Sequence, residues 1–91
     1  MNTNKTVDYL TKHEAVAIIC QRAQQLEAGA NTLLDDVKPN DDLISIAIKE
    51  LISKKLDVYI EREYNGGKYK ETYHLSALQI NPKLTNELIH L

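Results

Sequence analysis

The sequence predicts a small α+β domain that is mainly helical, with two core helices, a β-hairpin and a short C-terminal helix. Apolar residues recur at steps of three and four over residues 12–28 and 42–55, and capping or stop signals bound each stretch. Residues 58–75 are rich in β-branched and aromatic side chains around a glycine pair, which predicts the hairpin. An asparagine-proline start predicts the last helix over residues 81–91.

The first helix is predicted from its start, its apolar face and its end. Thr11 and Glu14 have the spacing of a capping box, in which each side chain accepts the backbone amide of the other. Gly29 stands where a residue in the left-handed conformation ends a helix. The apolar positions at helical spacing are Val16, Ile19, Cys20, Ala23 and Leu26. We therefore interpret Cys20 as a small buried hydrophobe.

The second helix is expected to begin after Asp41 or Asp42 and to end near Lys55, because lysines favour the negative end of the helix dipole. Its apolar positions are Ile44, Ala47, Ile48, Leu51 and Ile52. The polar positions expected on the opposite, solvent side are Lys49, Glu50, Ser53 and Lys54.

The hairpin and the chain ends complete the predicted organisation. Residues 65–67, Asn-Gly-Gly, offer the positive backbone angles that a hairpin turn needs, and Glu61, Arg62 and Glu63 are expected on a solvent-facing edge. We expect residues 1–8 to form a flexible arm, 9–80 one domain, and 81–91 a helical tail. The leucines expected on one side of that tail are Leu84, Leu88 and Leu91.

Charge and composition favour a protein partner over nucleic acid. The net charge of the 91-residue chain is −2 and its pI is near 5.9, whereas domains that neutralise phosphates usually carry a basic face. One cysteine excludes an intramolecular disulfide, and no apolar run approaches the ~20 residues of a membrane span. We therefore expect a soluble cytoplasmic protein, or a nuclear or virion-associated one if the lineage is eukaryotic or viral.

No pattern in the sequence predicts an active site, and no catalytic residue, metal or cofactor is expected. His13 and Glu14 begin a zinc-protease motif, but Ala17 occupies the position of the second histidine. The aspartate pairs at residues 35–36 and 41–42 lack the alternating ligands of a calcium loop.

Two blocks of the sequence, taken in order, carry a family resemblance. The first block consists of Tyr9, Leu10, Thr11, Lys12, Glu14, Arg22, Ala23, Gln25, Leu26, Gly29 and Ala30. The second block consists of Asp42, Ile46, Ala47, Lys49, Glu50 and Leu51. Together they resemble the small assembly subunit of multisubunit RNA polymerases, called omega in bacteria, which has archaeal, eukaryotic and viral counterparts. The likeness extends over residues 9–71.

The resemblance implies a noncatalytic subunit of DNA-dependent RNA polymerase. Such a subunit clasps the C-terminal region of the largest subunit and aids assembly, and it meets DNA and RNA only through the complex. By resemblance, the residues expected to touch or shape the partner contact are Thr11, Lys12, Arg22, Gln25, Gly29 and Ala47. Structural roles explain Thr11, Gly29 and Ala47 as well, so Lys12, Arg22 and Gln25 are the residues that most need an outside partner. The apolar side chains of Leu33, Leu34 and Val37 fit a surface that a partner completes.

The sequence leaves two alternatives open. A winged-helix DNA-binding regulator has the same order of helix, helix, strand, turn and strand. Its recognition helix would bring basic or amide side chains to base edges, whereas Asp41 and Asp42 would meet phosphates with like charge. The second alternative is an unrelated protein-interaction module.

Overall fold

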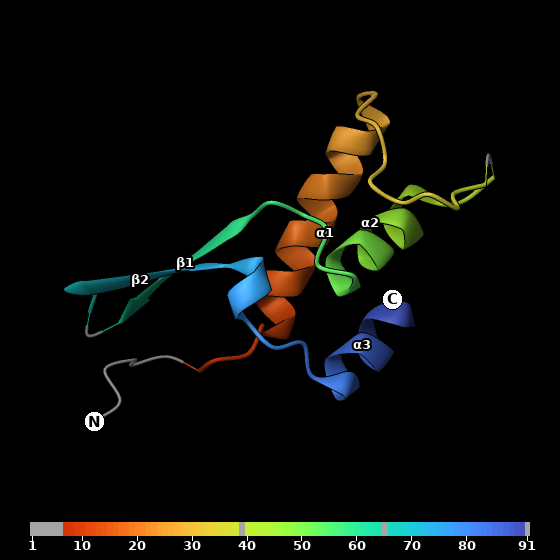
Figure 1. The fold of residues 1–91 in the computed structure, drawn as a ribbon. Coiled ribbons are helices and arrows are strands. Elements are labelled where there is room, and N and C mark those ends of the chain that lie inside the picture. The colour runs from red at the N-terminus through yellow and green to blue at the C-terminus, as the bar shows by residue number, and fades with distance from the viewer. Residues whose placement is uncertain (1–6, 39, 65, 91) are drawn as a thin grey trace.

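The computed structural model describes residues 7–38, 40–64 and 66–90. Its α-helices are α1 (Lys12–Glu27), α2 (Leu43–Ile52) and α3 (Pro82–Ile89), and its strands are β1 (Tyr59–Tyr64) and β2 (Tyr69–His74). A 3-10 turn at Leu75–Ala77 follows β2. Figure 1 shows α2 beside α1, α3 next to α2, and the hairpin extending away from the helices. The predicted α+β, mainly helical fold is confirmed.

The ends of α1 follow the sequence signals. The Glu14 amide donates to the Thr11 hydroxyl at 3.3 Å, and the Thr11 amide donates to the Glu14 carboxylate at 3.0 Å, so the predicted capping box forms. Gly29 has a φ of 106°. The amides of Gly29 and Ala30 donate to the carbonyls of Leu26 and Gln25, the pattern of a Schellman motif.

The buried face of α1 is rotated from the predicted one. Its buried side chains are Ala15, Ile19, Ala23 and Leu26. Val16 is half-buried, and Cys20 is exposed. The interpretation of Cys20 as a buried residue was wrong because the stripe through Ala15 and Ile19 leaves the next position, 100° around the helix, outside the contact with α2.

Helix α2 ends at Ile52, three residues before the predicted end at Lys55. Lys54 adopts a left-handed φ of 58°, and the amides of Lys54 and Lys55 donate to the carbonyls of Leu51 and Glu50. The helix therefore ends in a Schellman motif with lysine at the position that glycine usually takes. The Lys54 Nζ donates to the Leu78 carbonyl at 2.7 Å, and this tertiary hydrogen bond offsets part of the backbone strain.

The core is aliphatic and draws on every helix as well as the connecting segments. Its largest fully buried hydrophobic side chains are Leu10, Ile19, Leu51, Leu75, Leu78 and Leu88. Leu84 and Leu88 bring α3 into this core, with Asn81 capping the helix and Pro82 at its first position, as predicted. The third leucine expected on that side, Leu91, lies outside the described residues.

The hairpin pairs Tyr59 with His74 and Tyr64 with Tyr69 in antiparallel register. Gly66 and Gly67 have positive φ angles of 70° and 85°, as the turn prediction requires, while Asn65 lies outside the described residues. Figure 1 shows the turn of the hairpin on the side away from the helices.

The segment before α1 is tied to the segment after β2. The Leu10 amide donates to the Gln79 carbonyl at 2.8 Å, and the Gln79 amide donates to the Asp8 carbonyl at 3.0 Å. Of the arm predicted over residues 1–8, residue 8 therefore takes part in a backbone bridge, and residues 1–6 lie outside the described residues.

Candidate functional site

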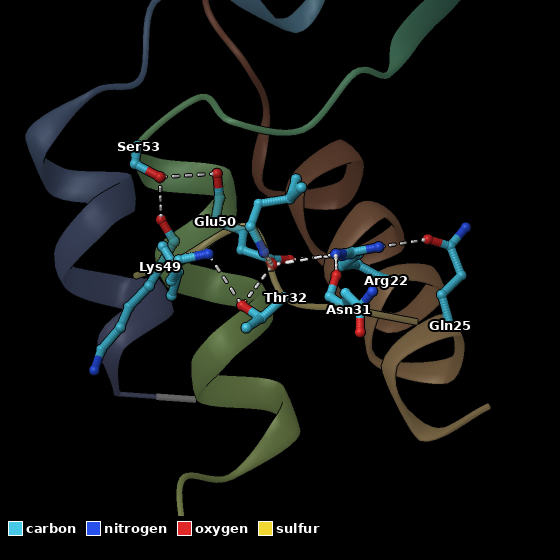
Figure 2. A network of polar contacts seen from close by, with 9 residues as sticks. Arg22, Gln25, Asn31, Thr32, Lys49, Glu50 and Ser53 are labelled. Atoms are coloured by element: carbon cyan, nitrogen blue, oxygen red, sulfur yellow. Dashed lines mark hydrogen bonds and ion pairs between the residues drawn. The ribbon is translucent and has the colours of Figure 1, made fainter. Parts of the chain in front are cut away.

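The contact between α1 and α2 is built around an ion pair between Arg22 and Glu50. The Arg22 Nε donates to Glu50 Oε1 at 2.6 Å, and the Arg22 Nη2 donates to Glu50 Oε2 at 3.2 Å. Only 12% of the Arg22 side chain and none of the Glu50 side chain is exposed. Figure 2 shows the two side chains meeting between the helices. A bidentate pair of this kind fixes geometry as well as charge.

The same carboxylate holds the loop that connects the two helices. Glu50 Oε2 accepts the Leu33 amide at 2.7 Å and the Thr32 hydroxyl at 3.0 Å. The Arg22 Nη2 also donates to the Asn31 carbonyl at 2.9 Å (Figure 2). The prediction that Glu50 faces solvent was wrong. Its four hydrogen bonds, two of them from Arg22, satisfy a buried carboxylate that would otherwise be costly to desolvate.

The ionisation of Glu50 depends on these donors. Burial by itself would raise the pKa of Glu50, but the hydrogen bonds from Arg22, the Leu33 amide and the Thr32 hydroxyl together outweigh burial and lower it. The pKa of Arg22 is raised, chiefly by its hydrogen bond to Glu50. Both groups are therefore charged at neutral pH, and the pair is a true ion pair.

A second ion pair, between the buried Arg62 and the half-buried Glu14, joins β1 to the start of α1. The Arg62 Nε and Nη2 donate to the two Glu14 carboxylate oxygens, each at 2.8 Å. Arg62 also donates to the Tyr9 carbonyl at 2.8 Å and to the Val7 carbonyl. The solvent-facing position predicted for Arg62 was wrong, because the alternation of the strand places it on the inward face with Ile60.

Glu14 thus has two roles, as the capping residue of α1 and as the partner of Arg62. The hydrogen bond from Arg62 is the largest effect on the pKa of Glu14, and with those from Thr11 it outweighs burial, so this pKa is lowered. The guanidinium of Arg62 has its pKa raised, mainly by the hydrogen bond to Glu14. The N-terminal segment, the first turn of α1 and the hairpin therefore meet at one charged contact.

The two lowered carboxylate pKa values predict that acid destabilises the fold. A carboxylate whose pKa is lower in the folded than in the unfolded chain contributes stability above its unfolded value, about 4.3, and loses it as the pH falls toward its folded value. We expect the urea midpoint to be nearly constant from about pH 7 to pH 5 and to drop below about pH 4. A midpoint that does not change between about pH 5 and pH 3 would contradict the role given to Glu14 and Glu50.

The residues expected at the partner contact do not form one cluster. They are Thr11, Lys12, Arg22, Gln25, Gly29 and Ala47. Lys12 lies at the start of α1, about 15 Å along the helix axis from Arg22. The Arg22 Nη1 donates to Gln25 Oε1 at 3.2 Å, and the backbone carbonyl of Gln25 accepts the amide of Ala30, which follows Gly29. Arg22, Gln25 and Gly29 therefore lie together at the C-terminal end of α1.

The six residues expected at the partner contact divide into exposed residues and residues with structural roles. Lys12 and Gln25 are exposed, and the Lys12 ammonium lies 3.6 Å from the Glu87 carboxylate in an open ion pair. Ala47 is completely buried, so its contribution is to packing. Thr11 caps α1, and Gly29 allows its last turn. Arg22 finds carboxylate and carbonyl partners within the chain, in Glu50 and Asn31.

Sequence reasoning missed Glu50, Thr32, and the pairing of Arg62 with Glu14. A signal was present for two of them. Glu50 follows Ile46 by four positions and therefore lies on the apolar stripe of α2, while Arg62 follows the buried Ile60 by two positions on a strand. A charged residue at such a position predicts a buried partner. No local signal marks Thr32, because its role depends on the path of the loop.

The described part of the chain offers no candidate metal site or membrane span. Within residues 7–38, 40–64 and 66–90, no group of three histidine, cysteine, aspartate or glutamate side chains gathers as metal ligands would. No helix among these residues has the length and apolar character to cross a bilayer.

Comparison with known proteins points to one family. The sequence model of the family described as RNA polymerase Rpb6 matches residues 6–58, a stretch that contains α1, α2, Arg22 and Glu50. The DNA-directed RNA polymerase subunit Rpo6 of Sulfurisphaera tokodaii is 45% identical over 60 residues, which are 65% of this chain and 70% of that subunit.

A eukaryotic relative is similar over a comparable stretch. The subunit RPABC2 of DNA-directed RNA polymerases I, II and III from Schizosaccharomyces pombe is 35% identical over 66 residues, which are 72% of this chain and 46% of the yeast subunit. The chain therefore spans about half the length of this relative. Since the family match covers more than half of the 91 residues, the chain belongs to the RNA polymerase Rpb6 family, the omega-type subunits of multisubunit RNA polymerases.

Proposed function

We propose that this chain is a noncatalytic subunit of DNA-dependent RNA polymerase that clasps the C-terminal region of the largest subunit and promotes its assembly. The family match over residues 6–58 is the observation that carries this proposal. The named relatives are subunits of DNA-directed RNA polymerases. The small aliphatic core and the partly exposed Leu33 fit a protein whose surface is completed by a partner.

The Arg22–Glu50 ion pair gives this role a physical basis. It joins α1, α2 and the loop at residues 31–33 into one unit, so the surface offered to the largest subunit is formed before binding. A preformed surface loses less conformational entropy on association than a loop that must become ordered. In this proposal Lys12 and Gln25 touch the partner, while the residues that shape the contact are Thr11, Arg22, Gly29 and Ala47.

The structure does not support the alternative of a winged-helix DNA-binding regulator. Helix α2, which would have to enter a groove of DNA, begins directly after Asp42, and the side chain of Asp41 accepts the Lys38 amide at 2.9 Å. Carboxylates at that helix start would face phosphates, and no release of bound cations would drive binding. DNA and RNA are therefore met only through the polymerase.

The proposal is tested by co-expression with the largest polymerase subunit encoded in the same genome. We expect the chain to increase the soluble yield of that subunit and to elute with it in size-exclusion chromatography, because the apolar surfaces of both are covered in the complex. A matched sample expresses the variant Glu50→Ala, which loses the ion pair. Equal yields of the largest subunit with and without the chain, together with separate elution, would contradict the proposal.

A further inference from the structure

The sheet formed by the described residues contains only β1 and β2, so each strand has an outer edge. The Leu75 amide donates to the Val58 carbonyl at 3.0 Å, which makes these two residues a hydrogen-bonded pair of the antiparallel ladder. Hydrogen-bonded and non-hydrogen-bonded pairs alternate along such a ladder, and the register is continuous to the end of the hairpin. Every second residue of β1 therefore directs its backbone amide and carbonyl away from β2. These residues are Tyr59, Glu61 and Glu63.

The outer edge of β1 is open to solvent. Tyr59 is 69% exposed, and the side chains of Glu61 and Glu63 are 57% and 58% exposed. Within residues 7–38, 40–64 and 66–90, no other segment forms a backbone hydrogen bond with any of the three. Figure 1 shows the hairpin extending away from the helices. The outward amides and carbonyls of β1 are thus left for an added strand.

All three outward positions of β1 favour a cation. Their side chains lie on one face of the strand because side chains alternate along it. Glu61 and Glu63 share the ammonium of Lys70, at 3.3 Å and 3.7 Å, so among the described residues this pair of carboxylates keeps an excess of negative charge. The ring of Tyr59 meets His74 at 4.9 Å in an edge contact, and the face of an exposed tyrosine ring attracts a cation. The charges of this edge therefore match a strand with basic side chains at alternate positions.

The outer edge of β2 differs in charge. Its outward residues are Lys70, Thr72 and His74. The ammonium of Lys70 is held by the two glutamates of β1, and the ring nitrogens of His74 lie 2.8 Å from Asp57 and from Ser76. The charged and polar groups of β2 are thus engaged within the hairpin and its flanking residues, whereas β1 keeps unbalanced carboxylate charge.

Charge also argues against other occupants of the β1 edge. Two copies that paired through β1 would bring the carboxylates of Glu61 and Glu63 in one copy beside those of the other, and like charges on facing strands are destabilising. Nucleic acid would bring phosphates to the same carboxylates, with no cation release to drive binding.

We propose that the outer edge of β1 binds an extended basic segment of another protein, which adds to the hairpin as a third strand. The backbone of that segment forms hydrogen bonds with Tyr59, Glu61 and Glu63. Its lysine or arginine side chains, at alternate positions, pair with the two carboxylates and cover the ring of Tyr59. The site is separate from the Arg22–Glu50 contact and does not depend on the proposed function, so either proposal can fail without the other.

The test titrates the full chain with a capped peptide of alternating lysine and valine, about six residues long to match a strand, and follows amide hydrogen exchange by NMR. Without peptide, the amides of Tyr59, Glu61 and Glu63 should exchange rapidly, whereas the amide of Ile60 should be protected. At a peptide concentration about ten times the dissociation constant, we expect the exchange of the three outward amides to slow about tenfold. A peptide with glutamate in place of lysine should not bind.

Variants separate strand addition from simple charge attraction. Glu61→Pro removes one outward amide but no hydrogen bond of the ladder, and proline is tolerated at such edge positions. Glu61→Gln removes the same charge and keeps the amide. We expect Glu61→Pro to raise the peptide dissociation constant about tenfold above that of Glu61→Gln. The matched control Thr72→Pro, directly opposite Glu61 on β2, should leave binding unchanged, and circular dichroism verifies that each variant is folded.

Several results would overturn the proposal. Equal peptide affinity of folded Glu61→Pro and Glu61→Gln would indicate charge attraction without an added strand. Slowed exchange at Lys70 and Thr72 in place of Glu61 would assign binding to β2. Slowed exchange of the Glu61 amide with rising protein concentration alone would assign the edge to a second copy. Failure of the lysine peptide to bind the unaltered chain would also contradict the site, while leaving the polymerase role untouched.

Discussion

Replacing Glu50 with alanine is expected to lower the free energy of unfolding by about 3–5 kcal/mol, the usual cost of removing one partner of a buried ion pair. The variant leaves Arg22 buried without its carboxylate and deprives the Leu33 amide and the Thr32 hydroxyl of their acceptor. Domains of this size are stable by roughly 5–14 kcal/mol in total. The loss is therefore a large fraction of the total stability, and urea denaturation followed by circular dichroism measures it.

Glu27→Ala is the matched control for this prediction. Glu27 is an exposed glutamate at the end of α1, so its replacement should change stability by less than about 0.5 kcal/mol. The variant Arg22→Met should approach the loss seen for Glu50→Ala, and the double variant should lose less than the sum, because each removes the same contact. A loss below about 1 kcal/mol for Glu50→Ala would show that the Arg22–Glu50 ion pair does not stabilise the fold as proposed.

The variant Arg62→Met is expected to cost about 3 kcal/mol and to release the N-terminal segment from the fold. Arg62 contacts Glu14 and the carbonyls of Val7 and Tyr9, and it is nearly as buried as the core. Methionine keeps the apolar stem of the side chain but lacks the guanidinium and cannot donate. Urea denaturation measures the cost, and hydrogen exchange locates it at the amides of Leu10 and Gln79, which bridge the two segments.

The exposed ion pairs of the same hairpin provide the comparison. Lys70 lies 3.3 Å from Glu61 and 3.7 Å from Glu63, but its side chain is 60% exposed. Lys70→Met should therefore change stability by less than about 1 kcal/mol and leave the exchange of Leu10 unchanged. Equal effects of the Lys70 and Arg62 variants would indicate that burial does not distinguish the two contacts.

The sequence predicted the elements whose signals are local. Thr11, Glu14 and Gly29 determine the start and end of α1 through backbone hydrogen bonds within a few residues, and Asn81 and Pro82 determine the start of α3 in the same way. Such signals do not depend on the rest of the fold. The family resemblance, which rests on blocks of residues in order, was confirmed as well.

The candidate site was less predictable because it depends on contacts between distant segments. Arg22 was singled out as a residue that needs an outside partner, yet Glu50, which lies 28 positions later and was expected in solvent, is its partner within the chain. Arg62 reaches Glu14 across 48 positions. Helix α2 ends at Ile52, before the expected Lys55, because Lys54 adopts a left-handed conformation, and its hydrogen bond to Leu78 is a tertiary contact.

These contacts give Arg22, one of the residues expected at the partner contact, a structural role within the chain. Arg22 was expected to reach outward to a partner, and the structure shows its guanidinium engaged with Glu50, Gln25 and Asn31. Arg22→Glu should consequently unfold the chain, because it sets two buried carboxylates against each other. A variant intended to test partner contact alone is better placed at Lys12, whose side chain is 56% exposed.

The most direct test of the proposed function is isolation of the tagged chain from its own cells under mild salt, with the recovered proteins quantified by mass spectrometry. We expect the largest RNA polymerase subunit to be recovered in a one-to-one ratio with the chain, together with the other core subunits. Recovery of the chain as a monomer, free of polymerase subunits, would contradict it.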